Sequence, residues 1–222
     1  MFVGHYAPAF AFKAVRKSPG LAAGFLAVQA IDIGFFTLTY FDVEKWRPNP
    51  DLPGMRKIDL YYMPYTHSLI GCLIWALAAG ALAYALSPAG RKAIAAAIIA
   101  ALVFSHWLLD LVVHRPDLAL IDDHDKVGFG LWNTPEIAMP LEIGLLLICF
   151  AIYLSVTQAR NTMGRIAPFV VLLVLLALQY IDWFMPVSSD HTLFTVLALV
   201  AYFGVGALGF WLDRTREPNA AH

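Results

Sequence analysis

The sequence predicts an all-α membrane protein: a polytopic bundle of about six transmembrane helices, preceded by a helix that reaches only half the membrane depth. Hydrophobic residues make up 60% of the 222 residues and charged residues only 14%, whereas soluble domains carry nearer ~25% charged residues. The mean hydropathy is +0.67. The apolar residues gather in runs of about 20, the length that a helix needs to cross the hydrocarbon layer. We therefore expect one integral membrane domain over residues 1–222.

The first apolar segment, Val3 to Val15, is too short to cross a membrane, and Ser18-Pro19-Gly20 separates it from the next run. Because proline and glycine interrupt helices, we expect a half-depth helix that forms a hairpin with the first full span. The six full spans are expected at residues 21–41, 66–86, 93–113, 136–156, 166–186 and 192–212. Spans two and three are rich in alanine, which allows close approach, so we expect them to pack against each other.

Basic residues predict the orientation of the spans. They lie before span one, between spans two and three, between spans four and five, and after span six (Lys13, Arg16, Lys17, Arg91, Lys92, Arg160, Arg165, Arg214 and Arg216). Because Lys and Arg are enriched in cytoplasmic loops, both termini are predicted to be cytoplasmic. The loop between spans one and two is an exception, since its basic residues fall on the outer side, where acidic residues offset them.

Five ionisable residues lie in or beside these apolar runs: His5, Asp32, His67, His106 and Asp110. At 1.5 Å per residue, four of them fall about 18–27 Å from the cytoplasmic edge, and His67 lies slightly higher. Ionisable groups in hydrocarbon are costly and usually functional. Each one alone is as easily explained by a packing hydrogen bond, but five at one depth favour a shared site. Histidine and aspartate supply nitrogen and oxygen ligands, so we predict a divalent-metal site, most simply for zinc.

His106 and Asp110 form the most specific local element, because residues four apart lie on one helix face. Both can bind one metal, or Asp110 can orient the ring of His106. His114 lies one turn beyond Asp110 on the same predicted helix face, and Glu142 lies inside span four. We assign His114 and Glu142 as candidate catalytic groups, with Glu142 as general base or additional ligand. The alternatives are a packed, hydrogen-bonded His114 and a Glu142 that only joins helices.

The outer loop between spans one and two carries Arg47, Arg56 and Lys57. These side chains can hold an anionic headgroup, because charge-assisted hydrogen bonds to phosphate or carboxylate are strong. A solvated surface loop is the simpler explanation of the same residues.

The chain also contains a weak internal echo. Gln29-Ala30-Ile31-Asp32 resembles Gln179-Tyr180-Ile181-Asp182, and each is followed by a His-Ser/Thr-Leu tripeptide, at His67 and at His191. Chance matches are frequent in apolar sequence and are the simpler explanation. If the echo reflects a duplication, Asp182 and His191 form a second polar site or its remains.

Several short motifs occur in a recognisable order: Gly4-His5, Ile31-Asp32, Tyr65-Thr66-His67-Ser68-Leu69 and Ser105-His106-Trp107-Leu108-Leu109-Asp110. This order resembles the YdjM-like inner-membrane proteins, a family described as LexA-binding and as membrane-bound metal-dependent hydrolases. The resemblance covers the first half of the chain. It implies an all-helical protein of the bacterial inner membrane with a metal at the five His and Asp positions. The chain departs from the family pattern after Ile31, where it has one aspartate and no adjacent histidine, and at Pro64-Tyr65.

Together these inferences predict a metal-dependent hydrolase that acts at the outer leaflet on an ester or phosphoester of an amphipathic, lipid-like substrate. A water in an open metal position would have a pKa near ~7 and serve as nucleophile. The alternatives are a transporter or ion-conducting protein that binds a cation or relays protons through the same residues, and a structural polar network. Membrane lipid is the expected partner. The net charge of −1 gives no reason to expect nucleic acid, and the sequence predicts no oligomeric state.

Overall fold

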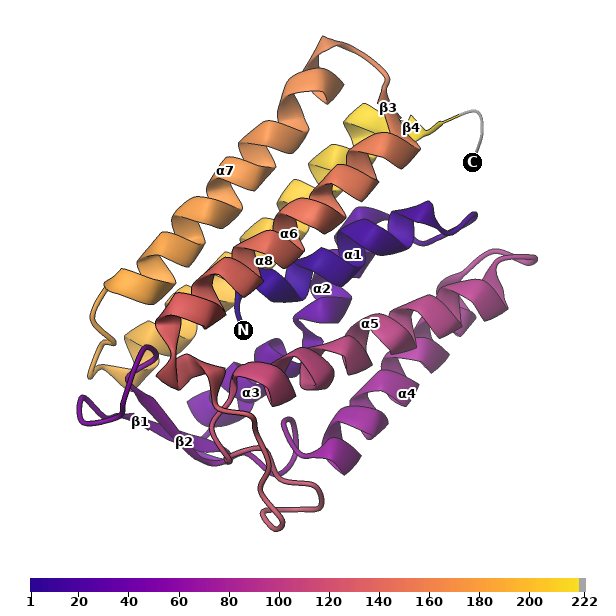
Figure 1. Cartoon of the computed structure of the whole chain (residues 1–222). Coiled ribbons are helices and arrows are strands. Elements are labelled where there is room, and N and C mark those ends of the chain that lie inside the picture. The colour runs from indigo at the N-terminus through magenta and orange to yellow at the C-terminus, as the bar shows by residue number, and fades with distance from the viewer. Residues whose placement is uncertain (220–222) are drawn as a thin grey trace.

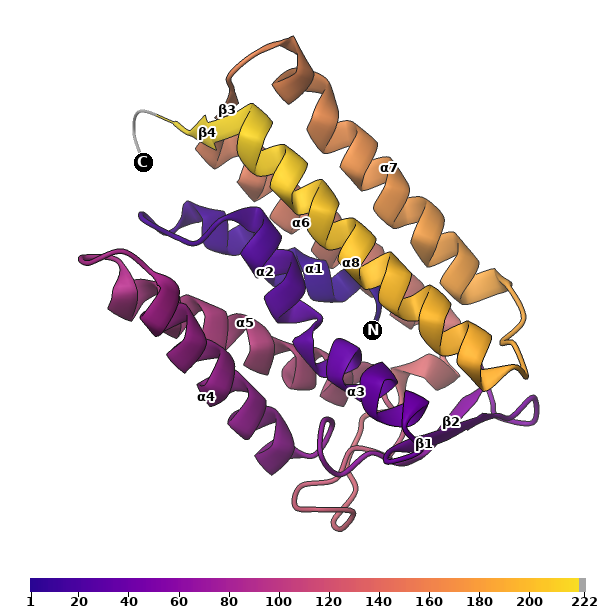
Figure 2. The same ribbon diagram turned by 180° about the vertical axis from the view of Figure 1, so that it is seen from behind.

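The computed structural model describes residues 1–219 and has the predicted all-α architecture (Figures 1 and 2). The long helices are α4 (Leu69–Leu86), α5 (Lys92–Val113), α6 (Pro135–Val156), α7 (Thr162–Phe184) and α8 (His191–Thr215). The shorter helices are α1 (Tyr6–Ala11), α2 (Leu21–Val28) and α3 (Ala30–Tyr40), with 3-10 turns η1 (Val3–His5), η2 (Phe12–Ala14) and η3 (Leu131–Asn133). Helices α4 and α5 form one group and α6, α7 and α8 another, with α1 and α2 between the two groups (Figure 1).

Within residues 1–219, five helices, α4 to α8, are long and apolar enough to cross a membrane, and the bent pair α2 and α3 can supply a sixth span. The polar residues that flank the apolar runs determine where several of these helices begin. Ser68, Asn161 and Asp190 each accept a hydrogen bond from a first-turn backbone N–H of α4, α7 and α8. Such caps satisfy donors that the helix itself leaves unpaired. The predicted spans are thus confirmed as helices, and their membrane crossing is supported by length and composition.

The first span differs from the continuous helix expected at 21–41. The chain forms two helices, α2 and α3, bent by 52° at Gln29. The carbonyl of Val28, the last residue of α2, accepts a hydrogen bond from Nδ1 of His106 on α5 at 2.7 Å. A carbonyl without a partner would be costly inside a membrane. The bend is therefore sustained by a side chain from another helix, which the local sequence does not reveal.

The N-terminal segment is helical, as expected, but it is split into η1, α1 and η2 and is buried inside the bundle. Tyr6 and Phe10 have no exposed surface. The ring of Phe10 meets Phe25 on α2 and Phe150 on α6 edge-on, with centroids 5.1 and 5.5 Å apart. Edge-to-face aromatic pairs are a favourable packing arrangement. This packing carries His5 into the interior of the molecule.

Helices α4 and α5 pack closely, as the alanine content of the two spans predicts. A Cβ at Gly80 on α4 would lie 3.1 Å from Cβ of Ala100 and from the carbonyl of Ala96 on α5. Small residues on both helices allow this approach. The pairing aligns the start of α4 with the last turns of α5, so that His67 faces the positions of His106 and Asp110.

Two short antiparallel ribbons were not predicted from the sequence. Strands β1 (Lys45–Pro48) and β2 (Ile58–Tyr62) pair within the loop between α3 and α4, with Arg47 opposite Asp59. Strands β3 (Thr157–Ala159) and β4 (Arg216–Pro218) join the end of α6 to the segment after α8. The β1–β2 ribbon lies at the opposite end of the bundle from β3 and β4 (Figure 1), and it brings loop 49–57 over the interior.

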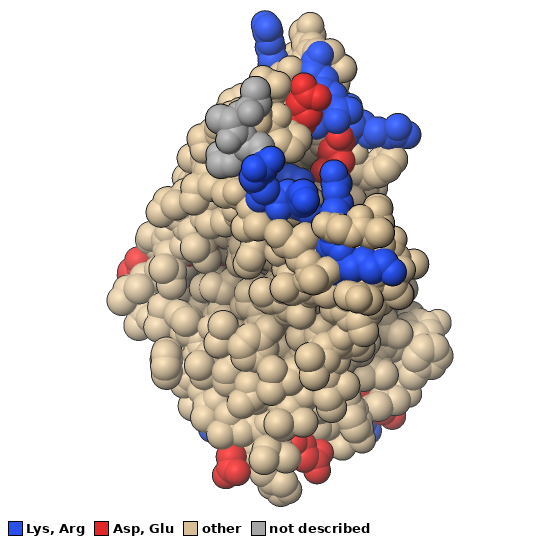
Figure 3. Space-filling view, turned by 90° about the vertical axis from the view of Figure 1, so that its right-hand side faces the viewer, with Lys and Arg blue, Asp and Glu red and all other residues tan. Residues whose placement is uncertain are grey.

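Charge is distributed unevenly along the bundle. Figure 3 shows Lys and Arg gathered at one end, above a broad band in which almost all side chains are uncharged. That end holds the turn between α4 and α5, the turn between α6 and α7, and strand β4 (Figure 1). The uncharged band is the surface expected of helices in hydrocarbon. The assignment of the basic end and the C-terminal segment to the cytoplasm stays a prediction. The N-terminus differs from the expected cytoplasmic position, because the amino group of Met1 is buried inside the bundle, 2.6 Å from Asp110 Oδ1.

Candidate metal centre

The five predicted ligands come from five separate parts of the chain and meet in the interior. His5 ends η1, Asp32 lies in the first turn of α3, His67 precedes α4, and His106 and Asp110 lie one turn apart on α5. The four other than Asp32 are at most 3% exposed, and the Asp32 side chain is 15% exposed. Their ligand atoms form two overlapping groups, His5-His106-Asp110 and Asp32-His67-His106, each within 4.8 Å. A buried His/Asp group that can hold a metal ion is therefore present.

Four nitrogen–oxygen separations among these atoms are close to those of a tetrahedral metal shell. Nε2 of His67 lies 3.4 Å from Asp32 Oδ1 and 3.8 Å from Asp110 Oδ2. Nε2 of His106 lies 3.5 Å from Asp32 Oδ1 and 3.1 Å from Asp110 Oδ2. In a tetrahedron with bonds of about 2.0–2.1 Å, ligand atoms are about 3.3–3.4 Å apart. These four nitrogen–oxygen separations are compatible with a bound divalent ion, and within residues 1–219 the sets whose ligand atoms all lie within 4.8 Å of one another are the two groups of three.

The hydrogen bond of His106 fixes which of its nitrogens is free. A carbonyl only accepts, so the contact of Nδ1 with Val28 O requires the proton to be on Nδ1. When the ring is neutral, its lone pair is at Nε2, toward the oxygens of Asp32 and Asp110. Within residues 1–219, this buried nitrogen has no well-directed hydrogen bond. A cation between the ring and the carboxylates would satisfy that lone pair, and a hydrogen bond from the other ring nitrogen is typical of metal-bound histidine.

His67 is oriented by a two-residue relay that the sequence did not reveal. Thr66 Oγ1 donates to Glu44 Oε2 at 2.6 Å, so its oxygen accepts from Nδ1 of His67 at 2.8 Å. Nε2 of His67 is thus also left to face Asp32. Glu44 accepts two more hydrogen bonds, from the backbone N–H groups of Tyr65 and Thr66. Burial nevertheless raises the pKa of the Glu44 carboxyl above its usual range, against these hydrogen bonds.

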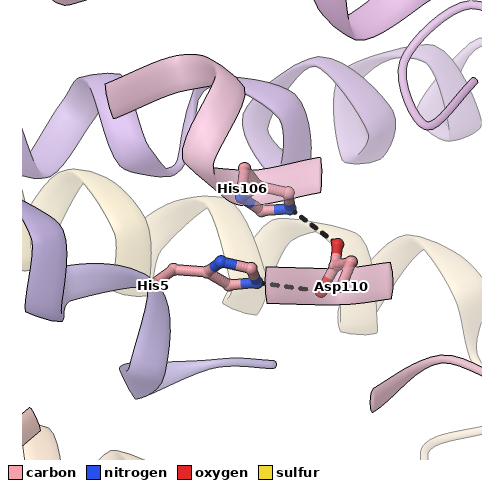
Figure 4. Close-up of side chains that lie close together, drawn as sticks. All are labelled: His5, His106 and Asp110. Atoms are coloured by element: carbon pink, nitrogen blue, oxygen red, sulfur yellow. Dashed lines mark hydrogen bonds and ion pairs between the residues drawn. The ribbon is translucent and has the colours of Figure 1, made fainter. Parts of the chain in front are cut away.

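The other oxygen of Asp110 serves a second set of partners. Oδ1 lies 3.1 Å from Nε2 of His5, 2.6 Å from the amino group of Met1 and 3.4 Å from Nε2 of His114. Figure 4 shows His5 and His106 on the two oxygens of Asp110, and their rings stack with centroids 3.7 Å apart. His5 therefore shares Asp110 with the other candidate ligands and lies on its other side.

His114, predicted as a catalytic group, lies at the edge of the site. Its Nδ1 is 2.8 Å from Asp117 Oδ1, which leaves Nε2 toward Asp110. Burial lowers the pKa of His114, but Asp110 and Asp117 raise it by more, so that the pKa lies above the usual value. The structure thus places His114 beside Asp110 with a carboxylate partner of its own.

Glu142, the other predicted catalytic group, contacts the N-terminal backbone. Its Oε1 accepts hydrogen bonds from the N–H groups of Phe2 and Gly4, the latter at 3.1 Å. These contacts hold η1, and hence His5, against α6. A positioning role explains the observed partners, whereas a role for Glu142 as base or ligand stays a prediction.

A small cavity of about 40 Å³ borders the site. Three of the candidate ligands line it, namely Asp32, His67 and Asp110, together with His114. The rest of its wall is mostly aromatic or aliphatic and comes from the N-terminus, α3, the β1–β2 ribbon with its connecting loop, η3 and α8 (Met1, Phe35, Phe36, Trp46, Arg56, Ile58, Leu60, Trp132, Phe194 and Tyr202). A volume of about 10–15 Å³ suffices for one water by this measure. The cavity therefore has room for a few waters or one small chemical group beside the ligands.

Two features of the site were not indicated by the sequence, and the conditional alternative of a second polar site at Asp182 and His191 finds no support. Tyr202, deep in α8, donates its hydroxyl to Asp32 Oδ2 at 3.0 Å, and Glu44 is contributed by a loop; neither belongs to a recognisable motif. The echo residues do not meet: Asp182 pairs with Arg56, and His191 stacks on Trp46 with centroids 4.3 Å apart. Among residues 1–219, no possible metal-binding group contains either of them.

The fold and the site together define a class: an apolar helical bundle with a buried His/Asp group that can hold a metal ion. Comparison of the chain with protein-family models, curated proteins and solved structures finds no match. The resemblance to the YdjM-like proteins therefore stays a prediction, and the interpretation of the site depends on its geometry.

Proposed function

We propose that this protein is a membrane-embedded, metal-dependent hydrolase, with zinc held by a subset of Asp32, His67, His106 and Asp110 that leaves one position open to water. The observation that carries the proposal is the position of His106 Nε2, which is buried, has no well-directed hydrogen bond within residues 1–219, and lies 3.5 and 3.1 Å from the oxygens of two carboxylates. When bound, zinc would lower the pKa of a coordinated water and polarise an ester or phosphoester oxygen. His5 and His114 complete the surroundings through the second oxygen of Asp110.

The position of the cavity favours catalysis over a closed structural site. Asp32, His67 and Asp110 line the cavity, whereas His106 does not. A metal held by three of the candidate ligands would keep one position open for a water, and the cavity beside Asp32, His67 and Asp110 is the space from which that water would approach. Hydrolysis adds water across the ester: the water oxygen bonds to the attacked atom, the ester bond breaks, and a proton passes to the leaving alcohol. His114, with Nδ1 held by Asp117, is the side chain placed to carry that proton.

The surroundings of the site argue against the transport alternative. Toward the basic end, the interior is filled by fully buried aromatic side chains, with Tyr6 and Phe10 both packed edge-on against Phe25. A cation path would need polar groups or water along this direction. The polar cluster and its cavity instead lie under the β1–β2 ribbon, at the other end. A hydrolase that takes its substrate from that side fits this arrangement better.

The resemblance to the YdjM-like proteins supports the same proposal and adds a location, the bacterial inner membrane. The sequence order of the candidate ligands follows the motifs of the resemblance, and the structure places those residues together. With the basic end in the cytoplasm, the cavity would face the outer leaflet, and the substrate would be amphipathic or lipid-like.

Elemental analysis of the detergent-purified protein tests the proposal directly. Wild-type protein should contain zinc at near one ion per chain after reconstitution, and the double variant His106→Ala/Asp110→Ala should contain none. His124→Ala, an exposed histidine in the loop between α5 and α6, is the matched control and should retain the metal. Circular dichroism of each variant checks that the helices remain folded.

Hydrolysis of long-chain p-nitrophenyl esters and phosphoesters is then measured on the same samples. Turnover by wild-type protein and by His124→Ala, lost in the double variant, would support the hydrolase. Wild-type protein that binds no metal, or a double variant that retains all of it, would refute the proposal.

A further inference from the structure

Arg56 is the residue of the cavity that the proposed chemistry leaves unexplained. Of the side chains that line the cavity, all of them within residues 1–219, Arg56 is the only Lys or Arg. It is 20% exposed, pairs with Asp182 through Nη1, and lies over the ring of Trp132 with 5.4 Å to its centroid. Within the described residues, Nε and Nη2 make no hydrogen bond. A guanidinium with free donors thus faces the same small space as the predicted metal ligands.

The loop that carries Arg56 is fixed in place by contacts of several kinds. The side chain of Arg115 donates to three of its carbonyls, those of Pro53, Met55 and Arg56, at 2.6 to 3.3 Å. The N–H of Met55 donates to the carbonyl of Trp132 at 2.8 Å. Gly54 has φ +64°, and a Cβ there would lie 2.0 Å from that same carbonyl, so only glycine fits. The loop that carries Arg56 is therefore an ordered part of the cavity wall.

The backbone of Arg56 itself has φ +60°, a region that residues with a Cβ adopt uncommonly. Residues held in such conformations by their surroundings occur preferentially at functional sites. With this conformation, the cationic side chain of Arg56 lines the cavity, and its neighbour Met55 is buried as well. By contrast Arg47, on the same ribbon, is 65% exposed, pairs with Asp59 and does not line the cavity.

The chemistry of the wall indicates what Arg56 would bind. An arginine fork matches phosphate and carboxylate oxygens, and it gains little from a neutral ester. The cavity of about 40 Å³ has room for a group on the scale of a few waters, which suits a phosphoryl group but not a large polar headgroup. Phe35, Phe36 and Phe194 supply an apolar wall beside it. An anionic phosphoryl group with an apolar chain meets both requirements.

We propose that Arg56 binds the phosphoryl group of an amphipathic phosphate ester, whose apolar chain packs on Phe35, Phe36 and Phe194. This inference rests on the proposed hydrolase function and narrows its substrate from an ester or phosphoester to a phosphoester. Asp182 holds the guanidinium in place and competes with the anion. Gln179 in turn donates to Asp182 at 3.3 Å and accepts from the N–H of Val3, which ties this pair to the N-terminal segment.

The test measures binding of decyl phosphate and of inorganic phosphate by isothermal titration calorimetry, at a fixed concentration of nonionic detergent. Arg56→Gln should weaken the binding of decyl phosphate at least tenfold, and Arg47→Gln, the matched control, should bind within twofold of wild type. Asp182→Asn, which removes the competing charge and keeps a hydrogen-bond acceptor, should strengthen binding several-fold. Damage to the fold would not produce such a gain.

Equal binding by Arg56→Gln and Arg47→Gln would overturn the proposal, as would an Asp182→Asn variant that binds no tighter than wild type. Tighter binding of decyl phosphate than of inorganic phosphate supports a lipid-like source of the phosphoryl group. Equal affinities would overturn the role of the apolar wall. Titrations with and without zinc separate the two proposals, because absence of bound zinc refutes the metal site, whereas loss of phosphate binding in Arg56→Gln reports on Arg56 alone.

Discussion

The relay from Glu44 through Thr66 to His67 offers a sharp test of the metal centre, because it acts on a ligand without being one. Thr66→Val replaces a hydroxyl by a methyl group of similar volume. It removes the acceptor of His67 Nδ1–H, at 2.8 Å, and the donor to Glu44, at 2.6 Å. Glu44 keeps its two backbone donors, the N–H groups of residues 65 and 66, so the backbone of this loop should keep its conformation.

The expected loss of zinc affinity follows from the burial of Thr66 and His67. Thr66 has no exposed surface and His67 is 3% exposed, so water cannot readily replace the missing acceptor. Without it, the proton of His67 is no longer confined to Nδ1, and the ring loses its fixed orientation. Removing such a partner of a metal-bound histidine typically weakens metal binding about 10–100-fold, or about 1.4–2.7 kcal/mol.

The assay is a zinc competition titration against a chromophoric chelator, in detergent and at constant pH. Thr215→Val is the matched control. Thr215 is also buried, and its hydroxyl donates to the carbonyl of Trp211 in its own helix at 3.0 Å, far from the site. Thermal unfolding with and without zinc provides a second readout, since a ligand that binds the folded state raises the unfolding temperature. The rise should be smaller for Thr66→Val than for Thr215→Val.

Two results would refute this reasoning. One is zinc affinity in Thr66→Val within twofold of wild type, which would mean that His67 is not a ligand or needs no orientation. The other is an equal loss in Thr215→Val, which would mean that any buried hydroxyl change weakens the fold enough to release metal.

Two further predictions concern the fold. Glu142→Gln should lower the free energy of unfolding by about 1.5–3 kcal/mol, because a neutral amide replaces the charged acceptor of the Phe2 and Gly4 N–H groups. Denaturant unfolding measures this change. Glu136 is exposed on the same helix, so the control variant Glu136→Gln should change the free energy of unfolding little. The second prediction concerns orientation. With the basic end in the cytoplasm, a membrane-impermeant maleimide should label His124→Cys on intact cells and Ala89→Cys only after lysis. The native Cys72 and Cys149 are buried and should contribute little background labelling. The reverse labelling pattern would place the basic end outside.

Much of the fold was predictable because the membrane imposes a strong length constraint. Runs of about 20 apolar residues specify helices α4 to α8 with little ambiguity, and the alanines of α4 and α5 indicated their close pairing. The β1–β2 ribbon was not predicted, because its strands are only 4 and 5 residues long, and alternation over so few residues is a weak signal. The bend at Gln29 was missed for a different reason. Its stabilising partner, His106, lies 77 residues away in the sequence, so no local signal marks it.

The candidate metal ligands were predictable from the sequence, whereas the residues that orient them were not. His5, Asp32 and His106 stand out in sequence because charge in an apolar run is costly. Glu44 and Thr66 do not stand out, because a polar residue in a loop or beside a histidine is ordinary. Arg56 was visible only as one of several basic residues in a loop. Its distinction from Arg47 arises from the contacts of Arg115, which depend on tertiary structure.

The bend in the first span links the fold to the site. In a continuous helix, the carbonyl of Val28 would pair with a later N–H of the same helix; at the bend it accepts from His106 instead. The same break makes Asp32 a first-turn residue of a new helix, α3, where the positive end of the helix dipole favours a carboxylate. Both effects serve the predicted centre, because one leaves His106 Nε2 as a free lone pair and the other stabilises the anionic form of Asp32. Loss of His106 would remove a ligand and also the partner of a backbone carbonyl, so the bend and the site stabilise each other.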